Sequence, residues 1–167
     1  MILGLDVSTS ITGATVIDRS GEILYCEAWD TRNKNKFPTI YDKALFIKEK
    51  LLDITTKRGY IIERVYVERN LQMFRAGFSS AKTLLTLAKF NGIVCYLCSE
   101  MVETKPEEIP VATARKLCGI KRENGEPFKK AVLKYMVKNE PKFSVKYTKF
   151  GNPKPGEYDR ADSIVIA

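Results

Sequence analysis

Apolar and polar positions at the start of the chain follow the pattern of three consecutive β-strands. Residues 2–7 form a short apolar run, residues 12–18 are rich in β-branched side chains, and a Ser-Gly turn leads into a third segment over 22–29. This order predicts an antiparallel meander. Gly13 lies near its first bend, where the absence of a side chain permits another backbone to approach closely.

Helical periodicity begins after the meander. Thr39 and Asp42 have the spacing of a capping box, apolar residues recur at helical intervals from Ile40 to Ile54, and Gly59 ends the predicted helix. The remaining expected elements are, in chain order, a strand over 64–69, a helix from Ser79 or Ser80 toward 93, a strand over 101–105, a short helix over 112–117, a helix over 129–138, a loop over 141–156 and a helix over 157–167. This order predicts an α/β fold with a mixed five-stranded sheet, in which three antiparallel strands precede parallel strands and helices cover both faces.

The length of 167 residues predicts a single domain over 1–167, with a core large enough to fold unaided. The last predicted helix stops in the apolar run 164–167 without a capping residue. Helices seldom end in this way, so we expect this helix to be truncated.

The net charge of +8 is unevenly distributed. Between Glu103 and Lys154 there are 13 basic and 6 acidic residues, which leaves only +1 for the rest of the chain. A basic segment on a nearly neutral body favours a polyanionic partner, although a lysine-rich solvated surface has the same composition.

The sequence contains no histidine, which excludes His-ligated zinc sites, Ser-His-Asp triads and Cys-His pairs. Cys95 and Cys98 form a C-x-x-C within an apolar run, without a second such pair, so we interpret them as buried free thiols. No signal peptide pattern follows Met1, and no apolar run reaches the roughly 20 residues of a membrane helix. We therefore expect a cytoplasmic protein that is not secreted and has no membrane partner.

Four carboxylates occupy positions of interest. Asp6 and Glu68 end apolar strands, and Asp159 and Asp162 are three residues apart on the terminal helix, which places them on one helix face. If the first and fourth strands are neighbours, the four side chains meet at one edge of the sheet. Such a cluster needs cations to offset its repulsion, and oxygen ligands suit Mg²⁺ or Mn²⁺. Each acid alone fits a solvated surface, but the combination predicts a pocket that binds phosphate through metal ions.

Three motifs occur in order along the whole chain: Ile2-Leu3-Gly4-Leu5-Asp6 with Ser8 and Thr12-Gly13, then Val67-Glu68, then Asp159-Arg160-Ala161-Asp162. Together with the basic stretches at 113–119 and 129–132, they resemble the RuvC-type Holliday junction resolvases of the ribonuclease H-like superfamily. Sugar kinases and actin-like ATPases share a motif similar to the first, and the late Asp-x-x-Asp helix separates the two groups.

The resemblance implies a ribonuclease H-like nuclease fold and a crossover junction endodeoxyribonuclease that resolves four-way DNA junctions by paired symmetric nicks. It implies two Mg²⁺ or Mn²⁺ ions per active site, held by Asp6, Glu68, Asp159 and Asp162, with Asp6 bridging both ions. Lys129 aligns with a lysine that assists at the scissile phosphate. The expected products carry 5′-phosphate and 3′-hydroxyl ends.

A four-way junction has near two-fold symmetry, so two nicks need two active sites, and a homodimer supplies them. The helix after Ser80 is the expected dimer contact. The segment from Arg69 to Ser80 is longer than in the bacterial enzymes, which points to a phage, viral or organellar branch and, for a viral branch, to the cytoplasm of an infected cell. Candidates for a wedge that opens the junction are Leu71, Met73, Phe74 and Phe78, although this apolar loop fits a dimer contact equally well.

Basic residues flank the predicted pocket, as a path for DNA phosphates requires. The expected DNA-binding residues are Arg115, Lys116, Lys121, Arg122, Lys130 and Lys134. Four more lysines, Lys142, Lys146, Lys149 and Lys154, lie in the loop before Asp159. This pattern predicts shape-led, strongly salt-dependent DNA binding.

Three other functions compete with junction resolution. The same active site could cut other branched DNA, such as flaps, forks or packaging intermediates. An actin-like or sugar-kinase ATPase fragment needs a second lobe for its nucleotide, which 167 residues do not provide, so no nucleotide cofactor is expected. A non-catalytic DNA-binding module would be indicated by loss of one of the four acids, and all four are present.

Overall fold

The structure is a computed structural model that describes residues 1–69 and 81–167. It contains a five-stranded sheet with the strand order β3-β2-β1-β4-β5. The strands are β1 (Ile2–Asp6), β2 (Ile11–Ile17), β3 (Ile23–Asp30), β4 (Arg64–Glu68) and β5 (Glu107–Ile109). The helices are α1 (Ile40–Leu52), α2 (Ala81–Val102), α3 (Val111–Leu117), α4 (Phe128–Asn139) and α5 (Glu157–Ile166), and a π-helical turn over Asp53–Lys57 extends α1.

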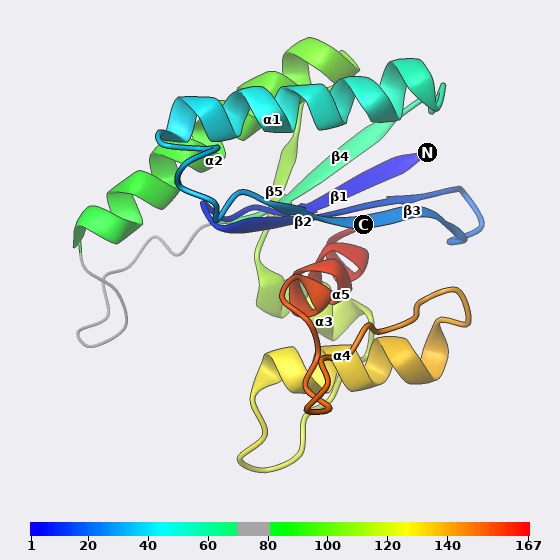
Figure 1. Ribbon diagram of the computed structural model, residues 1–167. Helices are drawn as coiled ribbons and strands as arrows, with labels where there is room; N and C mark the ends of the chain where they lie inside the picture. The colour runs from blue at the N-terminus through cyan, green and yellow to red at the C-terminus, as the bar shows by residue number, and fades with distance from the viewer. Residues whose placement is uncertain (70–80) are drawn as a thin grey trace.

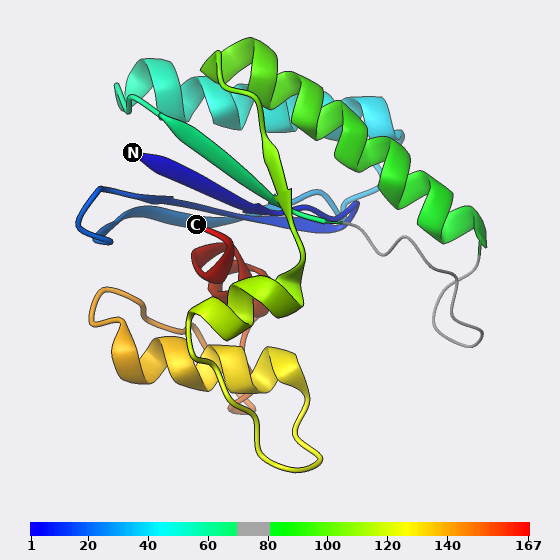
Figure 2. The same cartoon turned by 180° about the vertical axis from the view of Figure 1, so that it is seen from behind.

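Helices cover both faces of the sheet, as Figures 1 and 2 show: α1 and α2 lie on one face, and α3, α4 and α5 lie on the other. The strands β1, β2 and β3 pair antiparallel, whereas β4 pairs parallel with β1 and β5 pairs parallel with β4. This arrangement confirms the mixed sheet and the two helical layers expected from the sequence.

Strand alternation divides the apolar residues between two cores. Leu3 and Leu5 of β1 and Val65 and Val67 of β4 point toward α1 and α2, where they are buried in the larger core. The opposite face packs against α3, α4 and α5 in a second core that includes Val132, Met136, Ala161 and Val165. Because central strands bury both faces, they are apolar almost throughout, and their few polar residues are conspicuous.

The start of α1 is fixed by the predicted capping box. The Thr39 side chain accepts from the backbone N–H groups of Tyr41 and Asp42, and the Asp42 carboxylate accepts from the Thr39 N–H at 2.8 Å. Gly59, the predicted stop, follows the π-helical turn with a φ of 66°. In this left-handed conformation glycine is the least strained residue.

The predicted strand over 101–105 is wrong, because α2 continues through Met101 to Val102. Both residues pack against the larger core, so the helical apolar stripe extends beyond the predicted end near 93. The helix ends at Glu103, which adopts a φ of 55°. The fifth strand is β5 instead, and its residues Glu107 and Ile109 pair with Tyr66 and Glu68 of β4.

The extended α2 also corrects the expectation that no apolar stretch reaches the length of a membrane helix. Among the residues that the structure describes, α2 is the one helix long and apolar enough for a membrane span: it has 22 residues, and an 18-residue window within it has a mean hydropathy of 1.2, with 28% of the window buried. The core helix of a globular protein meets the same criterion, and α2 buries Phe90, Val94 and Cys98 in the larger core. The sequence prediction had divided this apolar stretch between a helix and a strand.

The four cysteines, Cys26, Cys95, Cys98 and Cys118, are free thiols, as the sequence predicted for Cys95 and Cys98. Cys98 is fully buried, and burial raises its pKa above the ordinary thiol value. The predicted burial of Cys95 is wrong: this residue is only half-buried, because it lies at the margin of the core.

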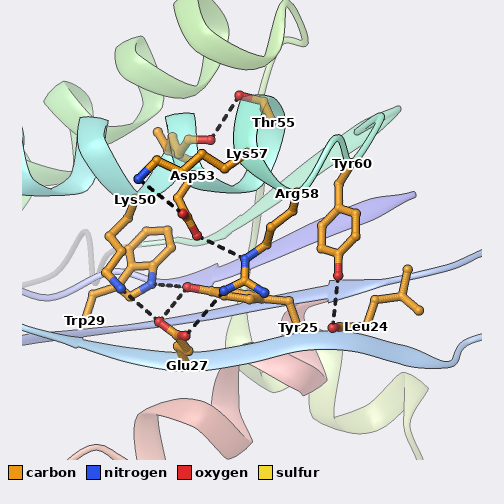
Figure 3. Close-up of polar contacts among 11 residues, drawn as sticks. Leu24, Tyr25, Glu27, Trp29, Lys50, Asp53, Thr55, Lys57, Arg58 and Tyr60 are labelled. Carbon is orange, nitrogen blue, oxygen red and sulfur yellow. Dashed lines mark hydrogen bonds and ion pairs between the residues drawn. The ribbon is translucent and has the colours of Figure 1, made fainter.

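A polar network joins β3 to α1 and the π-helical turn (Figure 3). The buried Trp29 indole donates to the Tyr25 hydroxyl at 2.7 Å, and this hydroxyl donates to the Glu27 carboxylate at 2.8 Å. Glu27 also accepts from Lys50 at 2.9 Å, and Arg58 stacks 4.8 Å from the centre of the Tyr25 ring. Burial raises the pKa of the Tyr25 hydroxyl, so it remains a protonated donor at neutral pH.

Replacement of Tyr25 by Phe is expected to lower the free energy of unfolding by about 1–3 kcal/mol, because the buried Trp29 N–H loses its acceptor. Urea unfolding followed by tryptophan fluorescence measures this change, since Trp29 is the one tryptophan of the chain. Tyr96→Phe is the matched control, because Tyr96 is 64% exposed and its loss of a hydroxyl should change stability by less than about 0.5 kcal/mol. Equal stabilities of the two variants would contradict the proposed role of the Tyr25 hydroxyl.

Candidate active site

Asp6 and Glu68 meet at the carboxyl ends of two adjacent parallel strands. Leu5 of β1 is opposite Val67 of β4, so the next residues on each strand are neighbours. Since Leu5 and Val67 face α1 and α2, the alternation of side chains turns Asp6 and Glu68 toward α5. Glu68 is close enough to Asp6 to raise the pKa of the Asp6 carboxyl.

Two glycines of the sheet allow α5 to approach this position. A Cβ atom on Gly13, which is opposite Asp6 in β2, would lie 1.9 Å from the Asp159 carbonyl oxygen. A Cβ atom on Gly4 would lie 2.4 Å from the backbone nitrogen of Ala167. The hydroxyls of Thr15 and Ser163, both fully buried, form a hydrogen bond of 2.8 Å across the same contact. The close approach of backbone that Gly13 predicted is therefore the approach of α5.

The terminal helix brings the other two predicted acids to the site. The Asp162 residue is 2% exposed, and its Oδ1 atom lies 3.2 Å from Nη2 of Arg115 on α3. The Asp159 carboxylate lies 3.7 Å from the ammonium group of Lys129 on α4. Three helices and two strands thus contribute side chains to one place, in agreement with the shared helix face predicted for the two aspartates.

The pKa values of several groups in the site are shifted, because acids are buried close to one another. Burial raises the pKa of Asp6 well above its ordinary value, and the adjacent Glu68 and Asp162 raise it further. Burial also raises the pKa of Asp162, against the opposing attraction of Arg115 and Lys129. Burial opposes the charge on Lys129, but the combined attraction of all four carboxylates raises the pKa of its ammonium group. Lys129 is therefore within electrostatic range of every predicted metal ligand.

The donor chemistry of the site suits a divalent cation. The available atoms are carboxylate oxygens, which are the ligands that Mg²⁺ and Mn²⁺ prefer. The negative charge of the acids attracts cations, and two of the acids already pair with cations of the protein: Asp162 with Arg115 and Asp159 with Lys129. Within residues 1–69 and 81–167, no three acids or cysteines converge closely enough to hold one ion. The four predicted ligands therefore form a cluster of four acids in which Lys129 and Arg115 offset part of the negative charge.

The predicted DNA-binding residues surround α3 and the start of α4. A cavity of about 320 Å³ lies between these helices, and its lining includes Arg115, Lys116, Lys121 and Phe128. The guanidinium groups of Arg122 and Arg115 lie 4.3 and 5.1 Å from the centre of the Phe128 ring. These cations lie beside the acidic cluster, because Arg115 also contacts Asp162.

Other predicted basic residues make different contacts. Lys134 forms an ion pair of 2.6 Å with Glu126, and Lys142 forms an ion pair with Glu22 in the turn between β2 and β3. Lys130 is exposed on α4, next to Lys129. The wedge candidates Leu71, Met73, Phe74 and Phe78 and the predicted helix caps Ser79 and Ser80 lie outside the described residues.

Sequence reasoning missed one cation of the site. Arg32, in the β3–α1 loop, is close enough to Asp159 for the carboxylate to raise the pKa of its guanidinium, after the larger effects of its neighbour Asp30. The run Arg32, Lys34 and Lys36 was the available signal, but the charge count directed attention to the second half of the chain.

The fold of this chain is similar to those of solved RuvC structures. The structure of T. thermophilus RuvC in complex with a Holliday junction substrate matches with a TM-score of 0.64 and 16% sequence identity, over 99% of this chain and 88% of that chain. This chain has the RuvC-type resolvase fold. A second Thermus thermophilus RuvC structure matches with a TM-score of 0.57 and 14% identity, over 99% of this chain and 91% of that chain.

The crystal structure of Ydc2, the yeast mitochondrial Holliday junction resolvase, matches with a TM-score of 0.61 and 13% identity, over 99% of this chain and 75% of that chain. No family model and no curated protein matches the sequence. The RuvC-type fold confirms the ribonuclease H-like architecture that the three sequence motifs implied.

Proposed function

We propose that this protein is a metal-dependent endonuclease that resolves four-way DNA junctions. The observation that carries the proposal is the convergence of Asp6, Glu68, Asp159 and Asp162 around Lys129, at the carboxyl ends of β1 and β4. The RuvC-type fold supports it, because one protein with this fold is known in complex with a Holliday junction and another is a mitochondrial resolvase.

The four carboxylates would hold two Mg²⁺ or Mn²⁺ ions. Bound ions of this kind supply the charge that activates water and stabilises the leaving oxygen of a phosphodiester. The protein contributes the positions of the ligands: Asp6 and Glu68 are fixed by strand register, and Asp159 and Asp162 by the close packing of α5 on the sheet.

Two cations of the chain have separate roles in this proposal. Lys129 is half-exposed and lies among the acids, so its ammonium group can contact the scissile phosphate. Arg115 is mostly buried between Asp162 and Phe128, so it orients the Asp162 carboxylate and is a positioning residue. Lys121, Arg122 and Lys130 then bind the flanking phosphates.

Paired nicks require two such sites, and we propose a homodimer that contacts through α2. This helix exposes large apolar side chains, including Leu85 at 71% and Tyr96 at 64%, on the face away from the sheet. An arrangement with two-fold symmetry would match the near two-fold symmetry of the junction.

The test is cleavage of a labelled immobile four-way junction in Mg²⁺ or Mn²⁺, beside matched duplex, fork and flap substrates. We expect paired symmetric nicks on the junction and at least about a hundredfold less cleavage by Lys129→Ala, because one charged contact to the phosphate is lost. Lys138→Ala is the matched control, since it removes the same charge at the far end of α4 and should leave cleavage unchanged.

The substrates distinguish the remaining alternatives. Equal cleavage of forks and flaps would replace the resolvase by a general branched-DNA nuclease with the same chemistry. Binding of junctions without cleavage in either metal would contradict the enzyme and leave a DNA-binding module.

A further inference from the structure

The β3–α1 loop, residues 31–39, lies at the same end of the sheet as Asp6. In Figure 1 the loop leaves β3 at the end of the molecule where α4 also begins, and the loop and α4 lie on opposite sides of the sheet. Thr31 anchors it: its N–H donates to the Ser10 carbonyl at 2.9 Å, and its hydroxyl lies within hydrogen-bonding distance of the Thr9 and Ser10 carbonyls. Lys43 of α1 also donates to the Thr9 carbonyl. The loop is therefore attached to the β1–β2 turn, which directly follows Asp6.

The loop is internally ordered as well. The Asn33 side chain accepts from the backbone N–H groups of Asn35 and Lys36, and the Asn33 carbonyl accepts from the Phe37 N–H at 2.8 Å. Phe37 is buried, with its ring centre 5.1 Å from that of Phe46. The Lys36 ammonium lies 5.2 Å from the centre of the Phe37 ring. A loop fixed in this way loses little conformational entropy when it binds a ligand.

Three cations and one acid define the charge of this loop and its base: Arg32, Lys34 and Lys36 against Asp30. The Arg32 guanidinium donates through Nε and Nη2 to the Asp30 carboxylate, at 2.9 and 2.6 Å. These bonds fix the plane of the group. Its remaining terminal nitrogen, Nη1, has no hydrogen-bond partner among the described residues. About half of the Arg32 side chain is exposed, so this nitrogen is accessible to a ligand.

A cavity of about 560 Å³ opens beside these groups, and its lining includes Arg32, Asn33 and Lys36. Oriented guanidinium and ammonium groups of this kind are suited to phosphate oxygens. Two aromatic rings also line the cavity, Phe37 of the loop and Phe46 of α1, with their centres 5.1 Å apart. The Lys36 ammonium lies 5.2 and 5.7 Å from the two ring centres, so the rings already carry a cation.

We propose that the β3–α1 loop is a second DNA-backbone site, in which Arg32 and Lys36 bind phosphates on the side of the active site opposite to α3 and α4. The inference rests on the proposed function and extends it. A strand crossing Asp6 and Asp159 would be held from both sides, by Arg32 and Lys36 on one and by Lys121 and Arg122 on the other. Asp30 is a positioning residue that orients Arg32. Contacts to phosphates alone carry no base preference, so this site contributes affinity and alignment.

The experiment compares Arg32→Gln/Lys36→Gln with Lys57→Gln/Lys138→Gln, a control pair that removes one cation from the π-helical turn after α1 and one from the last turn of α4. The ends of these two elements lie at the opposite end of the sheet from the β3–α1 loop (Figure 1). Binding to a labelled four-way junction and to linear duplex is measured without divalent metal between roughly 50 and 200 mM salt. The loss of two phosphate contacts should make the log-log salt slope less steep by about 1.8 on both DNAs, by the counterion-release rule. The control pair should leave the slope within about 0.5 of wild type.

A slope for the loop variant equal to that of the control pair would overturn the loop site while leaving junction resolution intact. Wild type that binds duplex as tightly as junctions would instead count against the resolvase, and a reduced slope for the loop variant would still support the loop site. Equal melting temperatures of the two variants exclude unfolding as the cause of a difference.

Discussion

Asp6→Asn is expected to abolish cleavage and, in the absence of divalent metal, to make the protein more stable. Loss of the central carboxylate should reduce junction cleavage by at least about a thousandfold, since a bound metal contributes several kcal/mol to stabilisation of the transition state. The same change removes a buried charge that Glu68 and Asp162 repel. We therefore expect an increase of about 1–2 kcal/mol in the free energy of unfolding near neutral pH.

The pH dependence gives the sign of this effect. Burial and neighbouring acids raise the pKa of Asp6 in the folded protein above its value in the unfolded chain. The folded state therefore holds the proton more tightly, and wild type loses stability relative to Asp6→Asn as pH rises from about 4 through the raised pKa. Thermal melts of both proteins in a chelator should differ by about 2–8 °C at neutral pH and converge toward acid pH.

Asp18→Asn is the matched control for this prediction. Asp18 lies in the exposed turn between β2 and β3, where hydrogen bonds from Ser20 and Glu22 lower its pKa. The same chemical change should therefore leave cleavage intact and should not stabilise the protein. Addition of Mg²⁺ should raise the melting temperature of wild type and of Asp18→Asn, but not of Asp6→Asn. A metal-induced stabilisation of Asp6→Asn equal to that of wild type would contradict the assignment of Asp6 as a metal ligand.

Gly13→Ala is expected to destabilise the fold and to impair catalysis together. Its new methyl group would lie 1.9 Å from the Asp159 carbonyl oxygen, which is backbone and cannot move without the helix. We expect a loss of about 3 kcal/mol or more in the free energy of unfolding, and a large fall in junction cleavage because α5 carries Asp159 and Asp162. Urea unfolding and cleavage rates of the same preparation measure the two effects.

Gly92→Ala is the control for stability. Gly92 lies within α2, and a Cβ atom there would have no heavy atom within 4 Å. Replacement of a helical glycine by alanine should stabilise the protein by about 0.5–1 kcal/mol. If Gly13→Ala were as stable as Gly92→Ala, α5 would not pack on the sheet as closely as the structure has it.

Local patterns in the sequence predicted most of the elements, because strand alternation, helix capping and turn residues act over a few positions. Thr39 with Asp42 specified the start of α1, and Val65 with Val67 identified the buried face of β4. The prediction failed at 101–105, where apolar residues of α2 fit either a helix or a strand. Only the pairing of Glu107 and Ile109 with β4 identifies the fifth strand, and such a three-residue pairing depends on a neighbour 41 residues away along the chain.

The sequence by itself determined which residues are the candidates for the chemistry. It contains no histidine, it has Asp6 and Glu68 at the ends of apolar strands, and it spaces Asp159 and Asp162 on one helix face. Only the tertiary structure decided how they meet. Parallel pairing of β1 with β4 joins the first two, and the approach of α5 over Gly4 and Gly13 adds the others. It also brought Arg32 near Asp159, from segments more than a hundred residues apart. Periodicity specifies the face on which a side chain lies, whereas contact between distant segments is set by the packing of the whole fold.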